Sequence, residues 1–165
     1  MLDLITPNPK KRYFMFQVLI LLMALVAVNF GSFAYSSSNQ LGTVEFPTSS
    51  SGSAQKHFIR GVAALHSFWY TEALSAFEQS TIADPDFAMG YWGLAMAHNH
   101  PLWEDQDKES ASEALSKIKD LSKLTQREQG YIHAVRLLYG DGEKHTRDKA
   151  YSKAMENIYH NYPND

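Results

Sequence analysis

Hydrophobic residues recur at helical spacing along most of the chain after residue 54, with polar residues between them. Intervals of three and four residues place the apolar side chains of a segment on one helical face. No segment shows the two-residue alternation of a strand. The pattern therefore predicts an all-α fold with six helices, near residues 54–68, 72–83, 87–98, 108–122, 126–139 and 147–161.

Helix-breaking and helix-capping residues lie between these segments. Asp84-Pro85-Asp86 ends the second helix, because proline cannot continue one. Thr125 and Glu128 fit a capping box, in which the hydroxyl and the carboxylate bind unpaired backbone amides. Gly140-Asp141-Gly142 separates the last two helices. The connections predict that the helices pair as three hairpins.

The first hairpin carries a repeat signature. Gly61, Ala73, Phe77 and Pro85 fall at the spacings of the tetratricopeptide pattern, and Tyr91, Leu94 and Ala95 open the next hairpin in the same register. In that pattern the small residues let paired helices approach closely, and the phenylalanine fills the gap between hairpins. We therefore expect residues 54–165 to form a tetratricopeptide-like α-solenoid of about three hairpins, although the second and third match the pattern poorly.

Longer sequence blocks resemble a family of tetratricopeptide-repeat proteins, exported or membrane-anchored, whose mostly bacterial members are largely uncharacterised. The matching residues are 41–47, 58 with 60–63, 65–70 with 72–73, 88–96, 100–103, and 127–128 with 131–132. The resemblance implies a helical repeat fold and a protein-binding role. Family members continue with more repeats after the segment that matches Tyr162-Pro163. The resemblance thus implies that residues 54–165 are truncated at the C-terminus, with an exposed repeat end open to self-association.

The N-terminal part has the organisation of an export signal. Lys10-Lys11-Arg12 precede an apolar run from Tyr13 to Phe30, which continues through small residues to Ala34. Residues 13–34 are long enough to cross a bilayer as one hydrophobic helix, and Ser32-Phe33-Ala34 also suits cleavage. Both alternatives, a membrane anchor or a cleaved signal peptide at 1–34, place the rest of the chain outside the cytoplasm, in the periplasm if the source is bacterial. An uncleaved N-terminus would stay cytoplasmic.

Residues 35–53 are rich in serine, and we predict a flexible linker there. The exception is Leu41–Pro47, whose larger side chains could lie against the first helix.

Charge and cysteine content limit the kinds of partner and metal site that the chain could have. Residues 1–34 hold three of the 15 basic and one of the 18 acidic residues, so 12 and 17 remain after them, a formal charge of −5. The chain has no cysteine, which excludes disulfides and thiolate metal sites. Because the one dense basic cluster lies in the leader, we expect no nucleic-acid partner.

Two clusters could carry chemistry. His66, His98 and His100 could supply three imidazoles to a metal, but histidines on packing stripes more often bind backbone carbonyls. The aromatic residues Trp69, Tyr70, Trp92 and Trp103 could form a cofactor pocket or could only fill space between helices. We expect no resident metal and no cofactor.

The sequence holds no recognisable catalytic motif, so we expect a binding protein and not an enzyme. The leading interpretation is a scaffold that binds a protein or peptide partner outside the cytoplasmic membrane. A metal- or cofactor-binding protein built on the His66/His98/His100 and Trp69/Trp92/Trp103 cluster is the alternative. Helical phase places six residues on the expected partner-binding face, namely Arg60, Ala64, Gly90, Met96, Gln129 and His133.

Overall fold

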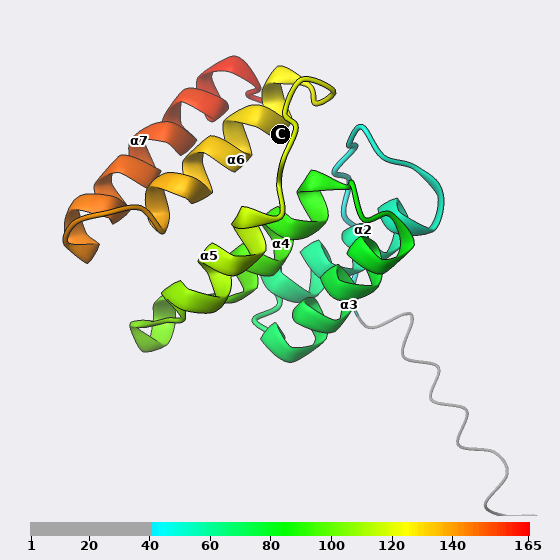
Figure 1. Cartoon of the computed structure of the whole chain (residues 1–165), viewed down its shortest axis with the longest axis horizontal. Coiled ribbons are helices and arrows are strands. Elements are labelled where there is room, and N and C mark those ends of the chain that lie inside the picture. The colour runs from blue at the N-terminus through cyan, green and yellow to red at the C-terminus, as the bar shows by residue number, and fades with distance from the viewer. Residues whose placement is uncertain (1–40) are drawn as a thin grey trace, which may run out of the picture. The chain divides into compact units, whose positions relative to one another are not determined.

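A computed structural model describes residues 41–165 (Figure 1). The leader predicted at 1–34, with its apolar run 13–34, lies outside the described residues, as do residues 35–40 of the linker. The described part contains six α-helices: α2 (Gly52–His66), α3 (Tyr70–Ala83), α4 (Ala88–Ala97), α5 (Lys108–Ser116), α6 (Gln126–Leu138) and α7 (Lys144–Asn161). The all-α prediction is confirmed for this part. None of these helices is both long and apolar enough to cross a membrane.

The main difference in helix bounds is at α5, which ends at Ser116 and not near 122. The last turn tightens, because the amides of Lys117 and Ile118 donate to carbonyls three residues back. The following loop then finds donors on α6. Gln129 donates to the carbonyls of Leu121 and Leu124, at 3.1 and 3.0 Å. The Gln129 side chain thus provides hydrogen-bond donors for backbone carbonyls of the loop, most of which the sequence pattern assigned to a longer α5.

The connection between α4 and α5 contains a small hairpin that the sequence did not predict. Strands β1 (Asn99–His100) and β2 (Asp105–Gln106) pair antiparallel around the short 3-10 helix η2 (Pro101–Trp103). The turn closes at Glu104, whose φ of 53° is left-handed. Two residues per strand are too few for alternation to be visible in the sequence.

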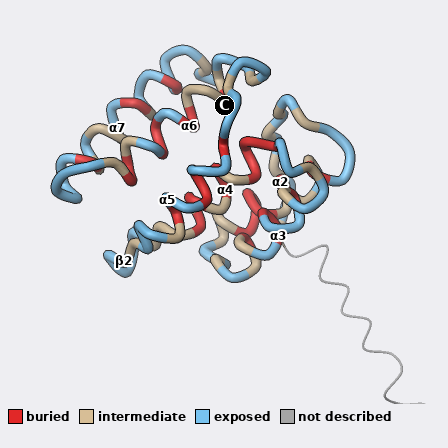
Figure 2. The backbone as a smooth tube through the Cα atoms, in the orientation of Figure 1, coloured by how far each residue is buried: buried red, intermediate tan, exposed pale blue. Residues whose placement is uncertain are grey.

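The helices pack mainly as neighbours in the chain. Helix α2 lies against α3, α4 against α5, and α6 against α7, while α4 also contacts α2, α3 and α6 (Figure 1). Buried residues concentrate where these helices face one another (Figure 2). Helix α4 is therefore the central element that joins the first and last pairs, and it is nearly all apolar or small.

Phe77 of α3 occupies the junction of the first three helices. Its ring is fully buried, and a Cβ atom placed on Gly61 of α2 or Gly93 of α4 would lie 2.6 or 2.3 Å from ring carbons. Real Cβ contacts are never that short, so both glycines are needed for this approach. The predicted position of Phe77 between the first two hairpins is confirmed.

Residues 41–51 lie against the helices, which differs from the flexible linker predicted for 35–53. Phe46 is the main contact, with its ring centroid 5.3, 5.8 and 5.2 Å from those of Phe58, Trp92 and Tyr131. These three residues belong to α2, α4 and α6 in turn. The segment therefore packs against the first helix, as predicted for Leu41–Pro47, and it also contacts the third helix pair.

We predict that Phe77→Ala lowers the free energy of unfolding by about 3–5 kcal/mol, because it leaves a cavity between three helices. Ile82→Ala on the same helix is the control, because Ile82 is 69% exposed and its change should stay within about 0.5 kcal/mol. Denaturant unfolding measures both. A loss below about 1 kcal/mol for Phe77→Ala would show that this junction does not hold the fold together.

Candidate binding groove

The capping box at the start of α6 is confirmed, and it does more than cap a helix. Thr125 Oγ1 accepts the Glu128 amide, and the Glu128 carboxylate accepts the Thr125 amide at 2.9 Å. The second oxygen of Glu128 accepts the backbone amide and the hydroxyl of Ser49, at 2.8 and 2.9 Å. A buried carboxylate thus ties residues 41–51 to α6.

Hydrogen bonds determine the charge state of this carboxylate. Burial alone would raise the pKa of Glu128, but the bonds from Ser49 and Thr125 outweigh burial and hold the pKa below its ordinary value. The carboxylate is therefore ionised at neutral pH, the form in which it accepts the bonds from Ser49 and Thr125.

Arg127 holds the same segment from the other side. Its guanidinium lies 4.2 Å from the ring centroid of Phe46, and Nη1 donates to the Pro47 carbonyl at 2.8 Å. Its Nε donates to Asp165 at 2.7 Å, and the Tyr131 hydroxyl donates to the same carboxylate at 2.8 Å. Burial would raise the pKa of Asp165, but these donors hold it below its ordinary value. Arg127 is thus a bridge between the segment and the end of the described chain.

A groove of about 470 Å³ opens beside Phe46. Its walls come from residues 44–46, from α2, α4, α6 and α7, and from η2. Most of the lining is apolar or aromatic, and it includes Val62, Leu65, Trp92, Met96, Tyr131, Tyr151 and Met155. The first helix of each pair contributes to it, because α4 contacts both α2 and α6. Trp92 and Tyr131, in edge contact at 5.6 Å, are the most buried aromatic residues of this lining.

The partner-binding face predicted from helical phase is not one surface. Of its six residues only Met96 lines the groove, while Ala64 and Gly90 are buried and cannot meet a partner. A Cβ on Gly90 would lie 2.8 Å from Thr81 of α3, so this position faces the neighbouring helix. The prediction assumed the same phase for each helix, whereas the groove-lining positions depend on how the helices rotate when they pack.

The other predicted face residues have separate roles. Arg60 pairs with Glu72, with its Nε 2.8 Å from the carboxylate. Gln129 is used by the α5–α6 loop, as described above. His133 is exposed and lines a different hollow of about 660 Å³ on the outer side of α6 and α7. This hollow lies on the last helix pair. The self-association predicted through the exposed repeat end stays a prediction.

Most of the repeat-signature residues lie at contacts between helices. Ala73 and Ala95 are fully buried at helix contacts, and Leu94 is partly buried. Pro85 stands in the turn between α3 and α4, where its carbonyl accepts the Tyr91 hydroxyl at 3.1 Å. Gly93 was not singled out from the sequence, yet it approaches Phe77 as closely as Gly61 does.

The three histidines do not form a metal centre. His66 is exposed and not on a core-facing stripe, but its Nδ1 does lie 2.9 Å from the Val62 carbonyl, the structural role expected of it. His100 contacts Asp105 through Nδ1 and the Ala97 carbonyl through Nε2, at 2.8 and 3.1 Å. Among residues 41–165, no three His, Cys, Asp or Glu side chains are grouped closely enough to hold an ion.

The predicted aromatic set divides into two. Trp92 is 6% exposed at the base of the groove, whereas Trp69 and Trp103 are 48% and 63% exposed. Tyr70 contacts Trp103 with ring centroids 5.9 Å apart. These four side chains therefore do not enclose one cofactor pocket.

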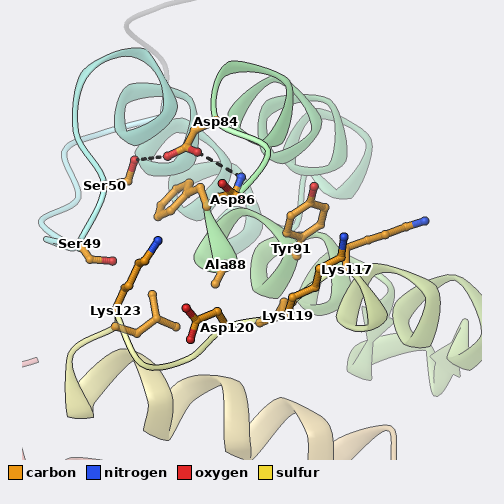
Figure 3. A pocket seen from close by; sticks show the side chains of 13 residues that line it. Ser49, Ser50, Asp84, Asp86, Ala88, Tyr91, Lys117, Lys119, Asp120 and Lys123 are labelled. Atoms are coloured by element: carbon orange, nitrogen blue, oxygen red, sulfur yellow. Dashed lines mark hydrogen bonds between the residues drawn. The ribbon is translucent and has the colours of Figure 1, made fainter.

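A second hollow, of about 270 Å³, lies between residues 49–50, the α3–α4 turn and the α5–α6 loop (Figure 3). Its lining mixes Asp84, Asp86 and Asp120 with Lys117, Lys119 and Lys123. Asp84 already accepts the Ser50 hydroxyl and the Asp86 amide (Figure 3). Opposite charges in equal number select neither an anion nor a cation, so the groove beside Phe46 is the better candidate site.

The chain matches no protein-family model, no curated protein and no solved structure. The family resemblance therefore rests on the sequence blocks alone.

Sequence reasoning missed the residues that hold the segment in place, namely Phe46, Ser49 and Arg127. Leu41–Pro47 and Arg127-Glu128 were among the blocks of the resemblance, which was the available signal. Nothing in the local pattern indicates that two segments about 80 positions apart meet.

We predict that Glu128→Gln lowers the free energy of unfolding at pH 7 by about 1.5–3 kcal/mol, the usual size for hydrogen bonds to a charged group. The folded-state pKa of Glu128 is lowered, so its contribution is complete above about pH 4.3, the ordinary pKa of glutamate, and is lost as the pH falls through the folded value. Denaturant unfolding from pH 7 to 3 should show this decline in the unaltered chain and a smaller one in the variant.

The exposed Glu113 on α5 provides the control, because Glu113→Gln should change stability by no more than about 0.5 kcal/mol. An equal effect of the two substitutions would contradict the role given to Glu128.

Proposed function

We propose that this chain is a tetratricopeptide-type helical repeat protein that binds an extended segment of a protein partner outside the cytoplasmic membrane. The binding site is the groove beside Phe46. Three consecutive helix pairs, with a phenylalanine between two glycines at their first junction, support the repeat assignment. In such repeats the first helix of each pair lines the binding surface, and α2, α4 and α6 do so here.

One observation carries the proposal: a segment without helix or strand already lies on this surface. Residues 44–50 bind through an aromatic anchor, Phe46, and through backbone contacts, with the Pro47 carbonyl on Arg127 and the Ser49 amide on Glu128. Gln55 adds a third backbone contact, donating to the Phe46 carbonyl at 2.8 Å. Buried aromatic anchors combined with main-chain hydrogen bonds are the usual means of holding an extended peptide.

The groove that remains beside this segment has its own chemistry. Aromatic rings and the thioethers of Met96 and Met155 line it, and Met side chains adapt to differently shaped apolar groups. The occupant it fits best is an extended peptide with an apolar or aromatic side chain next to the ring of Phe46. The formal charge of −5 gives a weak preference for peptides with basic residues in the flanking positions.

Membrane attachment is part of the proposal through the sequence of the leader. Residues 13–34 have the length and composition of a bilayer-spanning helix with a cytoplasmic basic flank. A scaffold held in this way would present its groove near the outer surface of the membrane. The chain would recruit a partner there without itself performing a reaction.

A display library of extended peptides, selected against the full chain in detergent, tests the groove. We expect the selected peptides to share an apolar or aromatic residue and to lose at least about tenfold in affinity with Leu65→Arg or Met96→Arg, since a charge would be desolvated in the groove. His133→Arg is the control, because His133 is exposed outside the groove.

Peptides whose affinity is the same for the groove variants and for His133→Arg would contradict the proposed site. A selection that yields no binding peptide would contradict the proposed function.

A further inference from the structure

Exposed hydrophobic side chains gather in two turns of the described chain. Among residues 41–165, six large hydrophobic side chains are exposed, and four of them occupy these turns. Phe68 and Trp69, in the α2–α3 turn, are 52% and 48% exposed, and Leu102 and Trp103, in η2, are 67% and 63% exposed. Single exposed apolar residues need no explanation, but a contiguous group of this kind marks an interaction surface.

Ring contacts hold the two turns together. Tyr70 lies 5.9 Å from Trp103, 4.1 Å from His100 and 6.5 Å from Phe68, measured between ring centroids. A shallow open hollow of about 630 Å³ lies among these rings, and no lysine or arginine lines it. Phe68, Trp69 and Trp103 line this hollow. Together with Leu102, the exposed neighbour of Trp103 in η2, they are called the aromatic patch below.

The backbone at the patch is strained. Phe68 and Glu104 have φ values of 58° and 53°, and they are the only non-glycine residues with positive φ among those described. Residues other than glycine rarely adopt this backbone conformation, and each instance costs free energy that the surroundings must offset. Both strained residues belong to the turns that expose the patch, and burial in the core does not compensate for either.

The sequence limits how far this surface can be from a membrane. The apolar run ends at Ala34 and the described unit begins at Leu41, so six residues, 35–40, connect them. Six extended residues reach about 20 Å. Residues 44 and 45 line the same groove as Phe68 and Tyr70, so the chain enters the unit beside the patch. A leader that spans the bilayer thus leaves the patch within reach of its surface.

We propose that the aromatic patch docks on the lipid bilayer at the level of the headgroups. The proposal rests on the membrane attachment included in the proposed function. Tryptophan and other aromatic side chains favour this interface, where an apolar ring and a polar edge are both satisfied. No lysine or arginine lines the hollow at the patch, and the charge of Arg60 nearby is balanced by Glu72, so docking depends on apolar contact and not on anionic lipid. Docking would orient the groove relative to the membrane.

The three tryptophans of the chain provide the measurement. All lie outside the leader, at positions 69, 92 and 103, and Trp92 is buried at the groove. The full chain is reconstituted into phosphatidylcholine vesicles with and without bromine on the acyl carbons nearest the headgroup. We expect bromine to quench most of the emission from Trp69 and Trp103, independently of salt. Trp69→Phe/Trp103→Phe, which keeps only Trp92, should lose nearly all quenching.

Two further variants separate docking from mere proximity. Phe68→Ser/Leu102→Ser keeps all three tryptophans but weakens the patch, so quenching should fall severalfold. Ile82→Ser/Tyr159→Ser is the matched control, because Ile82 and Tyr159 are as exposed as the patch residues but lie on α3 and α7. It should leave quenching unchanged.

The remaining outcomes overturn one proposal or the other. Chain that floats with the vesicles but shows no quenching of Trp69 and Trp103 would keep the anchor and reject the docking. Emission that is blue-shifted without bromine quenching would identify a protein contact at the patch and would also reject the docking on lipid. Chain that does not float with the vesicles would reject the membrane attachment itself, and the docking with it.

Discussion

The ring of Phe77, held between Gly61 and Gly93, is the constraint on which the rest of the structure depends. Glycine at both positions lets α2 and α4 come to the ring at distances that any Cβ would forbid. This contact determines the spacing of the first helices of two pairs. Because α4 also contacts α6, the same spacing determines the groove that all three line. Packing at the first junction therefore also shapes the groove that we propose as the binding site.

Residues 41–51 complete that surface. Phe46 touches one aromatic residue from each of α2, α4 and α6, so a segment outside the helices joins all three pairs. Arg127 stacks on the Phe46 ring, and Arg127 and Glu128 hold the backbone of the segment through charge-assisted hydrogen bonds. The segment shows which contacts a second extended chain would find in the same groove: an aromatic anchor and partners for its main chain.

The sequence predicted the features that depend on neighbouring residues in the chain. Helical spacing predicted six helices, and Thr125 with Glu128 predicted the cap of α6, because such signals act over one or two turns. The repeat signature placed Phe77 correctly, since its spacing encodes the hairpin junction. The partner-binding face was not predictable in this way, because the packing of α3 buries Gly90 and no periodicity contains that rotation. The contact between Ser49 and Glu128 is likewise tertiary, and a serine-rich stretch reads as a linker until its partner is known.

A double-mutant cycle between Gly93→Ala and Phe77→Leu tests the central claim most directly. Alanine raises helix propensity equally in both backgrounds, so that effect cancels in the cycle. If the ring requires the glycine, Gly93→Ala should cost about 1–3 kcal/mol more with phenylalanine at position 77 than with leucine, because the smaller side chain leaves room for the added Cβ. Effects that add to within about 0.5 kcal/mol would contradict the account and show that the spacing of α2 and α4 is set elsewhere.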